Sequence, residues 1–389
     1  MEHDVIVVGG GLVGASFARA LRGRRIALVE SSQRATGADE AAPDVFDARV
    51  YALSPGSVAF LEEIKVWQAI PAARKTPVRT MRVRGDDGAA HLEFDAYDAG
   101  VPELAWIVED RELQNALWRV LGAQDEFEHF AGSACSGLTV DADAARLDMA
   151  DGRRISARLV IGADGARSFV RAAAGIWASE RSYGQSAVVA NFACSHAHGN
   201  VAFQWFQGGP VLALLPLPGN RTSMVWSVAD ARAAELMAAA PDALARQVEQ
   251  ASGGVLGTLE VITPPQAFAL RCVVAERAVA PRIALIGDAA HVIHPLAGQG
   301  ANLGFQDARA LAAVLAAGVP LRDPGDLRLL RRYERSRREA VLAMRGTVNG
   351  LFELFGAQSA PLRRLRNLGL NLTGRLPVIR NVLARQALA

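Results

Sequence analysis

Short apolar runs and a helical pattern alternate at the start of the chain. Val5–Val8 is a β-branched run that predicts a buried strand, and Ile26–Glu30 predicts a second one. Between them, a glycine-rich stretch leads into a helical pattern that continues through Leu21. A strand, a helix and a strand in this order predict a βαβ unit, in which a parallel sheet carries helices on its faces.

The same two patterns recur along the rest of the chain. Helical periodicity covers Ser57–Trp67, Arg111–Leu121, Pro241–Ala251 and Gly300–Leu315, and strand-like runs occur at Arg158–Ala163 and Ile283–Ile286. Short alternating runs with turn signals predict β-structure in residues 76–104 and from Tyr183 to Leu270. The remainder is mostly helical, with breaks at Pro361, Gly374 and Pro377.

The β-rich stretches are inserted between α/β stretches, so the expected domains are interleaved rather than consecutive. The α/β domain is expected to comprise residues 1–75, 105–180 and 271–345. The β-rich domain would comprise residues 76–104 and 181–270, followed by a basic helical segment at residues 346–389.

The composition argues against a nucleic-acid-binding protein and against a membrane-spanning one. The chain has 389 residues, of which 51% are hydrophobic and 21% charged, as in an ordinary globular protein. The net charge is +2, so no global field would attract nucleic acid, and no nucleic-acid partner is expected. No apolar run approaches the ~18 residues that a membrane-spanning helix needs.

The cysteine and histidine positions argue against a disulfide framework and a metal centre. Cys135, Cys194 and Cys272 are far apart and form no Cys-x-x-Cys pair, a pattern that favours reduced thiols in the cytoplasm. His196 and His198 would share one face of a strand, but no carboxylate or cysteine cluster accompanies them. A solvated loop is therefore expected there rather than a metal site.

Charge is distributed unevenly along the chain. Residues 327–389 contain 13 arginines against 3 acidic residues, a net charge of +10, which leaves −8 on the remainder. Two interpretations are open. In one, the arginines cover solvated helices packed on the body of the protein. In the other, Arg and Leu side chains form an amphipathic surface that contacts anionic lipid or a partner protein.

The first of three motifs is Gly9-x-Gly11-x-x-Gly14, which follows a strand and opens a helix. Gly9 allows a tight turn, Gly11 lets the backbone approach a pyrophosphate, and Gly14 lets helix and strand pack closely. Glu30 ends the next strand, where it can accept hydrogen bonds from both hydroxyls of an adenosine ribose. The motif predicts a dinucleotide site at a helix N-terminus, and the carboxylate disfavours the 2′-phosphate of NADP there.

Two further motifs also follow strands. The second is Gly162-Ala163-Asp164-Gly165-Ala166-Arg167-Ser168, and the third is Gly287-Asp288-Ala289-Ala290-His291 with the loop His294–Asn302. A strand delivers Asp288 to the carboxyl edge of the sheet, where ligands bind in open α/β folds, and its carboxylate can hydrogen-bond a ribityl or ribose hydroxyl. The loop leads into a helix whose first N–H groups would stabilise the negative charge of a reduced flavin.

Together these motifs resemble those of the class A flavoprotein monooxygenases, the FAD-dependent aromatic hydroxylases related to p-hydroxybenzoate hydroxylase. Within that class the chain resembles the ubiquinone-biosynthesis hydroxylases (the 2-polyprenyl-6-methoxyphenol hydroxylase-like family), and the likeness covers essentially the whole chain. The segments that carry it are Asp47–Ser54, Val108–Gln114, Tyr183–Gln185, Gly209–Trp226, His294–Gly304 and Tyr333–Arg335. Two departures, the compressed turn Gly23-Arg24-Arg25 and an aspartate at Asp110 where many relatives have asparagine, leave FAD binding intact.

The resemblance implies an α/β fold in which a Rossmann-like FAD-binding domain is interleaved with a β-sheet substrate domain and followed by C-terminal helices. The residues implied to bind FAD are Gly9, Gly11, Leu12, Val13, Gly14, Glu30, Arg49, Arg111, Gln114, Asp164, Gly165, Gly287, Asp288, Pro295, Gly298, Gln299, Gly300, Ala301 and Asn302. Arg49, His294 and Pro295 are the candidate catalytic residues. His294 is an equally good candidate for a satisfied loop histidine, and His291 is expected to be structural. No metal is expected.

The function that the resemblance implies is hydroxylation of the ring of a polyprenylated phenol in ubiquinone biosynthesis, through a flavin C4a-hydroperoxide formed with O₂. A single Gly-x-Gly-x-x-Gly argues against a second nucleotide-binding domain, so either NAD(P)H binds transiently as reductant or a protein donates the electrons. The alternatives are another FAD-dependent aromatic hydroxylase or oxidoreductase on the same scaffold, and a non-catalytic flavoprotein subunit of a biosynthetic complex. The expected location is the cytoplasm, with peripheral contact at the inner membrane as a further possibility.

Overall fold

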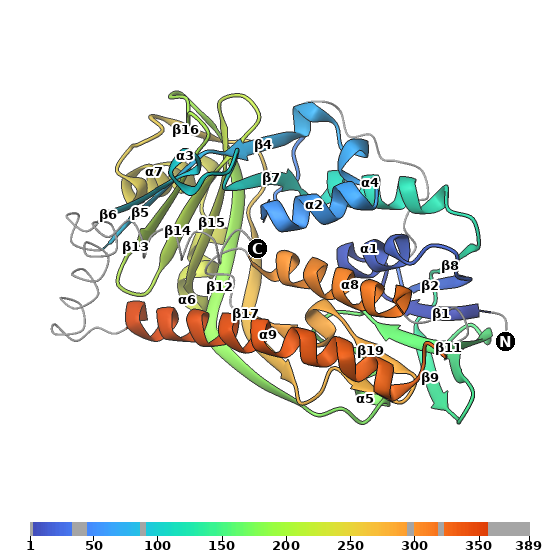
Figure 1. Ribbon diagram of the computed structural model, residues 1–389. Helices are drawn as coiled ribbons and strands as arrows, with labels where there is room; N and C mark the ends of the chain where they lie inside the picture. The colour runs from blue at the N-terminus through green and yellow to red at the C-terminus, as the bar shows by residue number, and fades with distance from the viewer. Residues whose placement is uncertain (1–2, 33–44, 86–90, 294–298, 318–322, 357–389) are drawn as a thin grey trace.

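The computed structural model describes residues 3–32, 45–85, 91–293, 299–317 and 323–356. The strands in these ranges form three sheets. Figure 1 shows the largest sheet on the left and the sheet that contains the N-terminal strand on the right. The long helix α9 (Leu327–Gly356) runs along both parts.

The N-terminal sheet has a parallel centre. Its order is β18-β19-β11-β1-β2-β8, and β1 lies between β2 and β11, with which it pairs in parallel. The strands are β1 (His3–Val8), β2 (Ile26–Glu30), β8 (Phe127–Ala131), β11 (Arg154–Gly162), β18 (Val279–Ala280) and β19 (Ile283–Leu285). Two antiparallel strands, β9 (Cys135–Val140) and β10 (Ala145–Met149), extend the sheet from β11.

Both faces of this sheet are covered, which explains why its strands are apolar throughout. On one face Val5 and Val7 pack with residues of α1 (Leu12–Ala20), α4 (Asp110–Gly122) and α8 (Gly300–Ala316). On the other face Ile6 and Val8 pack against β9, β10 and the short helix α5 (Phe169–Ala173).

The largest sheet is mostly antiparallel and has nine strands within the described ranges. Its order is β20 (His291–Val292), β17 (Gln266–Ala275), β12 (Ala178–Cys194), β15 (Arg221–Ala229), β14 (Val211–Leu217), β13 (Val201–Phe206), β5 (Thr80–Arg84) and β6 (His91–Asp95), with β16 (Leu259–Val261) beside β12. Helices α6 (Asp230–Ala238) and α7 (Pro241–Ser252) cover one face, where Trp205 and Trp226 are part of the core.

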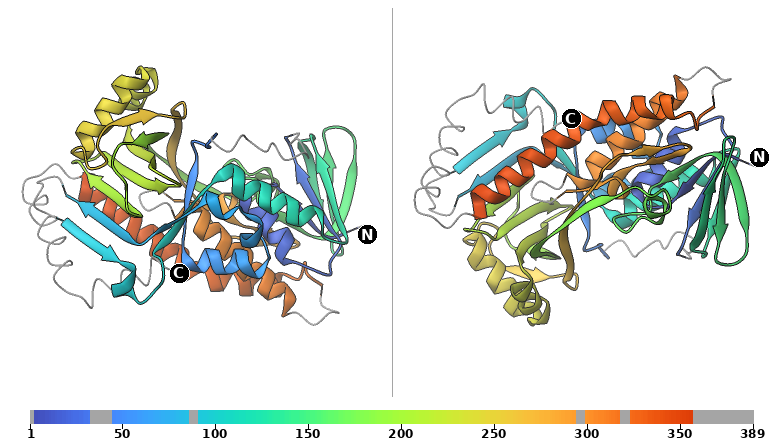
Figure 2. Two further views of the ribbon diagram at one scale, coloured as in Figure 1. Left: turned by 90° about the horizontal axis from the view of Figure 1, so that it is seen from above. Right: turned by 90° about the horizontal axis from the view of Figure 1, so that it is seen from below.

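A three-stranded sheet joins the two larger ones. It contains β3 (Val50–Leu53), β7 (Ala105–Glu109) and β4 (Lys75–Val78). Helix α2 (Pro55–Glu63) and the short helices η1 (Trp67–Ala69) and η2 (Ala72–Arg74) accompany it, and α3 (Ala96–Ala99) follows β6. Seen from above and below in Figure 2, the largest sheet and the N-terminal sheet lie at opposite ends of the molecule.

The α/β architecture confirms the fold class predicted from the sequence, and each helix and strand named there has a counterpart in the structure. Among the elements that the sequence patterns missed are β3, β7, β8, β9, β10, α5 and α6. Helix α9 continues through residue 346, so no break occurs at that expected boundary. The breaks expected at Pro361, Gly374 and Pro377 lie outside the described residues. No helix in the described ranges is long and apolar enough to cross a membrane.

Candidate functional site

The three sequence motifs meet at the carboxyl edge of the parallel strands. Gly9 N donates to Val29 O at the end of β2, over 2.8 Å. Ala163 N, just after β11, donates to Val8 O at 2.8 Å, and Ile286 N, just after β19, donates to Gly162 O at 3.0 Å. Residues nearly 280 positions apart therefore form one edge, which is where ligands bind in open α/β sheets.

The glycines of the first motif are required by space. A Cβ atom on Gly9 would overlap the carbonyl of Ala163, and one on Gly14 would overlap the carbonyl of Gly9. By contrast, a Cβ on Gly11 would meet nothing within 4 Å. Gly11 is the N-cap of α1, so the open space lies at the positive end of a helix, where a pyrophosphate is stabilised.

The neighbouring residues of α1 have a packing role. Leu12 is buried, and Val13 packs against Gly287 and Gly304. A Cβ on Gly287 would lie 3.2 Å from the Val13 side chain, and one on Gly304 would overlap it. Val13 therefore holds the first and third motifs together.

Glu30 lies at the end of β2 beside the first motif. Its Oε2 accepts a hydrogen bond from Gly10 N at 2.8 Å, and its Oε1 accepts one from Ser32 N at 3.1 Å. These bonds orient the carboxylate. Oε1 also accepts from Ser32 Oγ at 3.0 Å, and this hydroxyl, which can rotate, is the partner that a ribose hydroxyl would replace.

The polar side chains of the second motif bond to one another and to the start of α5. Asp164 Oδ1 accepts from Ser168 Oγ at 2.5 Å and Asp164 Oδ2 accepts from Val170 N at 3.1 Å, which caps α5. Gly165 has φ +79°, a left-handed conformation that glycine adopts without strain. Arg171 donates to Ala166 O at 2.6 Å and to Ala289 O at 2.8 Å, so it ties this motif to the third one. Arg171 follows the motif by three residues, and the sequence did not reveal this bridging role.

Asp288 is the carboxylate that the sheet edge offers to a ligand. Burial raises its pKa, although His291 and Arg49 act in the opposite direction. Its side chain is nevertheless solvent accessible, so the carboxylate lies in a recess that protein surrounds on most sides. That placement suits a group that hydrogen-bonds a cofactor hydroxyl.

Arg49 lies near this recess between two aromatic rings. Its Cζ is 5.2 Å from the ring centre of Tyr51 and 5.4 Å from that of Phe268, which is 38% exposed. Burial raises the pKa of Tyr51, and a hydrogen bond with the Asp110 side chain adds to the increase. The guanidinium is held by cation–π contacts and remains exposed enough to reach a ligand.

A buried network positions the segment that carries Arg49. Asp47 N donates to Glu109 Oε2 at 2.7 Å, and the Asp47 carboxylate accepts from Arg49 N and Arg111 N at 3.0 and 3.2 Å. Glu109 in turn pairs with Arg74 Nη1 at 2.9 Å, and both side chains are buried. Burial raises the pKa of Glu109, opposed by the Asp47 N–H and by Arg74. Sequence reasoning missed Arg74 and Glu109 as positioning groups, because nothing local reveals their pairing.

The start of α8 supplies the remaining cofactor candidates in the described residues. Gln299 is its N-cap, and Gly300, Ala301 and Asn302 form the first turn, whose N–H groups have no intrahelical partner. The Asn302 side chain is already used: Oδ1 accepts from Ser54 N and Nδ2 donates to Ala52 O, each at 2.9 Å. Asn302 can therefore serve a ligand through its backbone only. His294, Pro295 and Gly298 lie outside the described residues.

Two predicted residues sit on α4. Arg111 donates from Nη2 to Val45 O at 2.7 Å, and Gln114 is buried. His291 is buried as well, and its ring bonds Asp307, as a structural histidine would. The ring of His198 contacts the carbonyls of Leu217 and Gly219.

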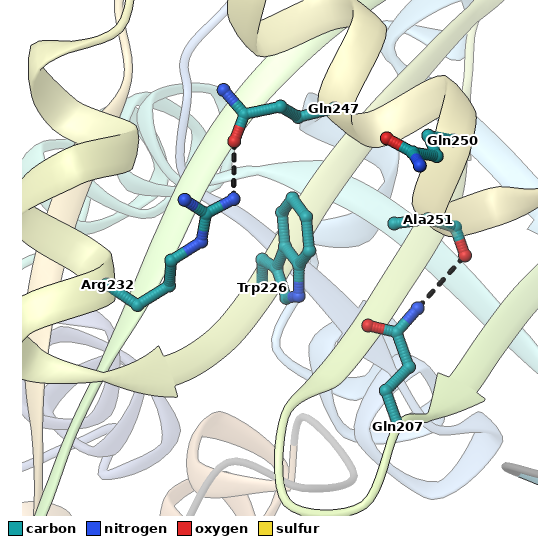
Figure 3. A pocket seen from close by; sticks show the side chains of 6 residues that line it. All are labelled: Gln207, Trp226, Arg232, Gln247, Gln250 and Ala251. Carbon is teal, nitrogen blue, oxygen red and sulfur yellow. Dashed lines mark hydrogen bonds between the residues drawn. The ribbon is translucent and has the colours of Figure 1, made fainter.

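A polar hollow in the largest sheet is separate from this site. Figure 3 shows it between α6, α7 and the sheet, lined by Gln207, Trp226, Arg232, Gln247, Gln250 and Ala251. Gln207 Nε2 donates to Ala251 O at 3.0 Å across it. Trp226 pairs with Val188 on β12, whereas Asn191, three residues further along β12, points to the opposite face and bonds Asp47. The hollow therefore opens on the face that is turned away from Arg49.

Comparisons with known proteins agree with this geometry. The family described as FAD binding domain matches residues 2–346. Ubiquinone hydroxylase UbiL of Rhodospirillum rubrum is 33% identical over 99% of this chain and 89% of that relative. The 3-demethoxyubiquinol 3-hydroxylase of Escherichia coli is 35% identical over 99% of this chain and 97% of that relative. The structure of PqsL, a probable FAD-dependent monooxygenase of Pseudomonas aeruginosa, has a TM-score of 0.78 over 95% of this chain and 100% of that chain.

The likeness to PqsL, at 24% identity, concerns the fold. The family match and the two relatives extend over nearly the whole chain, so they show the family as well as the fold. The residues at the sheet edge fit the cofactor, because there is open space at Gly11 and the Asp288 carboxylate is accessible just after β19. The first turn of α8 adds backbone N–H groups that have no intrahelical partner. The chain is an FAD-dependent monooxygenase and belongs to the family of the ubiquinone-biosynthesis hydroxylases.

Proposed function

We propose that the protein hydroxylates the aromatic ring of a polyprenylated phenol or quinol during ubiquinone biosynthesis. One ring C–H bond becomes C–OH, with O₂ supplying the hydroxyl oxygen. NAD(P)H or a protein donor supplies the two electrons that reduce the second oxygen atom to water. The observation that carries the proposal is the similarity, over nearly the full length of both chains, to the Escherichia coli enzyme named 3-demethoxyubiquinol 3-hydroxylase.

FAD supplies the oxygen chemistry when it is bound, and the chain supplies binding, orientation and exclusion of water. In this proposal the pyrophosphate lies at Gly11 and the N-terminus of α1, and Glu30 accepts from the adenosine ribose. Asp288 accepts from a hydroxyl of the ribityl chain, and the first turn of α8 faces the flavin ring. Gly9, Gly14, Leu12, Val13, Gly165 and Gly287 shape the edge, while Gln299, Gly300, Ala301 and Asn302 present backbone N–H groups.

The proposed substrate position lies beside Arg49. Phe268 is 38% exposed and Tyr51 is partly buried, so the two rings that hold Arg49 also provide apolar surface against which a substrate ring can pack. Arg49 would then contact both the cofactor and the substrate. His294 and Pro295, the other candidate catalytic residues, adjoin the start of α8 in sequence and stay predictions.

A polyprenylated substrate is stored in a bilayer, so we also propose that the protein meets it at a membrane surface. The support is the net charge of +10 on residues 327–389, together with the leucines, valines and isoleucines spread through residues 362–383. A basic segment with apolar residues is attracted to anionic lipid headgroups.

The decisive test uses purified protein loaded with FAD. It is mixed with NADH or NADPH, a short-chain prenylphenol and ¹⁸O₂, and the product is analysed by mass spectrometry. One ¹⁸O atom in the ring-hydroxylated product would support the proposal. The assay is then repeated with a reduced flavoprotein in place of the nicotinamide. The absence of hydroxylated product with both donors, even if the phenol stimulates nicotinamide oxidation, would overturn the proposal. Product formed only with the protein donor would identify the electron source as a protein.

A further inference from the structure

A fully buried carboxylate lies directly behind the turn that presents Asp288. Asp307, on α8, is 0% exposed and accepts three hydrogen bonds in the described structure. Gly287 N donates to its Oδ2 at 3.0 Å and His291 Nε2 bonds the same oxygen at 2.7 Å. Arg337 Nε donates to Oδ1 at 2.7 Å. One side chain therefore connects the two ends of the Gly287–His291 segment to helix α9.

Helix α9 holds the same segment at a second point. The hydroxyl of Tyr333, which is 1% exposed, donates to Leu285 O at 2.9 Å. Tyr333 and Arg337 are four residues apart and so lie on one face of the helix, one turn from each other. Tyr333 bonds Leu285, the residue before Ile286. Arg337 acts through Asp307 on Gly287, the residue after Ile286. These two side chains restrain the position at which β19 ends and the turn begins.

The charges of this cluster are balanced around Asp307. Burial opposes ionisation of the carboxyl, but His291 and Arg337 together hold the pKa of Asp307 below its ordinary value. Burial likewise opposes the charged form of His291, but the adjacent Asp307 raises the pKa of His291. This buried carboxylate has a hydrogen-bond partner at both oxygens, and such networks hold their members in one arrangement.

We propose that Tyr333 and Arg337 of α9 are positioning residues for FAD, Tyr333 acting through the Leu285 carbonyl and Arg337 through Asp307. Neither side chain reaches the open edge of the sheet, so neither contacts the cofactor. Their effect is to fix the Gly287–Asp288 turn, and with it the carboxylate that receives a cofactor hydroxyl. Cofactor sites depend on such supporting hydrogen bonds because a loosely held contact group loses affinity.

The test measures the dissociation constant of FAD from the full-length chain by recovery of flavin fluorescence. Arg337→Met and Asp307→Asn should each raise this constant by roughly ten- to hundred-fold, the size of a lost charge-assisted hydrogen bond. Tyr333→Phe keeps the buried ring and loses only the hydroxyl, so it should raise the constant by about five-fold. The matched control is Arg338→Met, because Arg338 is the exposed neighbour on the same helix and should leave the constant unchanged.

The melting temperature of the apoprotein separates positioning from ordinary stability. If the residues position FAD, the variants should bind FAD more weakly at temperatures well below the melting temperature of the apoprotein. Arg337→Lys keeps the charge and should recover part of the FAD affinity. An FAD constant within about two-fold of the wild type in both Arg337→Met and Tyr333→Phe, accompanied only by a lower melting temperature, would overturn the proposal. If Arg337→Met fails to fold, the near-isosteric Tyr333→Phe decides alone. FAD affinity is measured without substrate or reductant, so the result is independent of whether the proposed hydroxylation is correct.

Discussion

The side-chain amide of Asn191 donates to the backbone carbonyl of Asp47 at 2.7 Å, across 144 residues of sequence. Asn191 lies on β12 in the middle of the largest sheet and is completely buried. Asp47 begins the segment that carries Arg49. The bond therefore joins the sheet proposed to receive the substrate to the arginine proposed to contact the cofactor, and it is the shortest described link between them.

Asn191→Ala should destabilise the protein by about 1–3 kcal/mol, because the partly buried Asp47 carbonyl would lose its donor. The freed Arg49 segment should also raise KM for the phenol. Ser223→Ala is a suitable control, since Ser223 pairs with Asn191 in register, is equally buried, and its Oγ has no partner in the described structure. Urea unfolding of both variants measures the difference. Equal losses in the two variants would show that the Asp47 bond contributes nothing specific.

Gly11→Leu should abolish FAD retention while the apoprotein keeps its melting temperature. The reason is that a Cβ on Gly11 meets no protein atom within 4 Å, and the leucine side chain beyond it would occupy the space proposed for the pyrophosphate. Gly122→Leu, at an equally open position at the end of α4, is the matched control and should keep its flavin. The visible spectrum of the purified variants gives the answer. Normal flavin content in Gly11→Leu would refute the placement of the motif.

The two aspartates of the second and third motifs should respond differently to replacement. Asp288→Asn should raise the FAD dissociation constant with little change in melting temperature, because this carboxylate lies in a recess and is available to a ligand. Asp164→Asn should lower the melting temperature, because its oxygens already bond Ser168 and Val170. Fluorescence titration and thermal denaturation of each variant separate the two roles. If Asp164→Asn weakened FAD binding and Asp288→Asn lowered the melting temperature, Asp164 would be the cofactor contact and Asp288 the structural residue.

Stability should depend on pH through the pair His291 and Asp307. The folded-state pKa of His291 is raised above 6.5, so its contribution is fully present below pH 6.5 and is lost as pH rises through the raised value. The pKa of Asp307 is lowered below 3.8, so its contribution is present above pH 3.8 and is lost as pH falls through the lowered value. The groups that face the pair are Arg337 on α9 and Asp288.

The measurement is the free energy of unfolding of the apoprotein against pH, compared between wild type and His291→Gln. The wild type should lose more stability than the variant as pH rises above 6.5, because only the wild type then loses a proton from this site. Parallel curves in that range would show that His291 does not carry the expected charge.

Removal of residues 361–389 should weaken binding to anionic vesicles and leave FAD bound. The deletion takes out arginines 363, 364, 366, 375, 380 and 385 and removes none of the described residues at the sheet edge. Cosedimentation with vesicles rich in phosphatidylserine measures the effect, and vesicles of phosphatidylcholine alone are the control. Binding of the full chain should also fall with added salt, as screened electrostatic attraction requires. Undiminished sedimentation of the truncated chain would exclude this segment as the membrane contact.

The sequence by itself determined the parts of the molecule whose contacts are local. The strand, glycine turn and helix around Gly9, Gly11 and Gly14 depend on backbone geometry within about 30 residues, so their residue types reveal them. The same holds for α4, α7 and α8, whose apolar periodicity matches the faces that they bury. Asp288 was identified because it directly follows a recognisable strand.

Only the tertiary structure decided which buried polar groups meet. Asp307 is an acid on an apolar helix, which signals that it needs partners but not that these are Gly287, His291 and Arg337. Asn302 and Asp164 are predicted to bind FAD, and only the fold shows that their side chains bond Ser54 and Ser168. Periodicity reports which face of an element is buried. The partner on that face depends on how distant segments pack, and that information appears only when β19, α8 and α9 come together around one carboxylate.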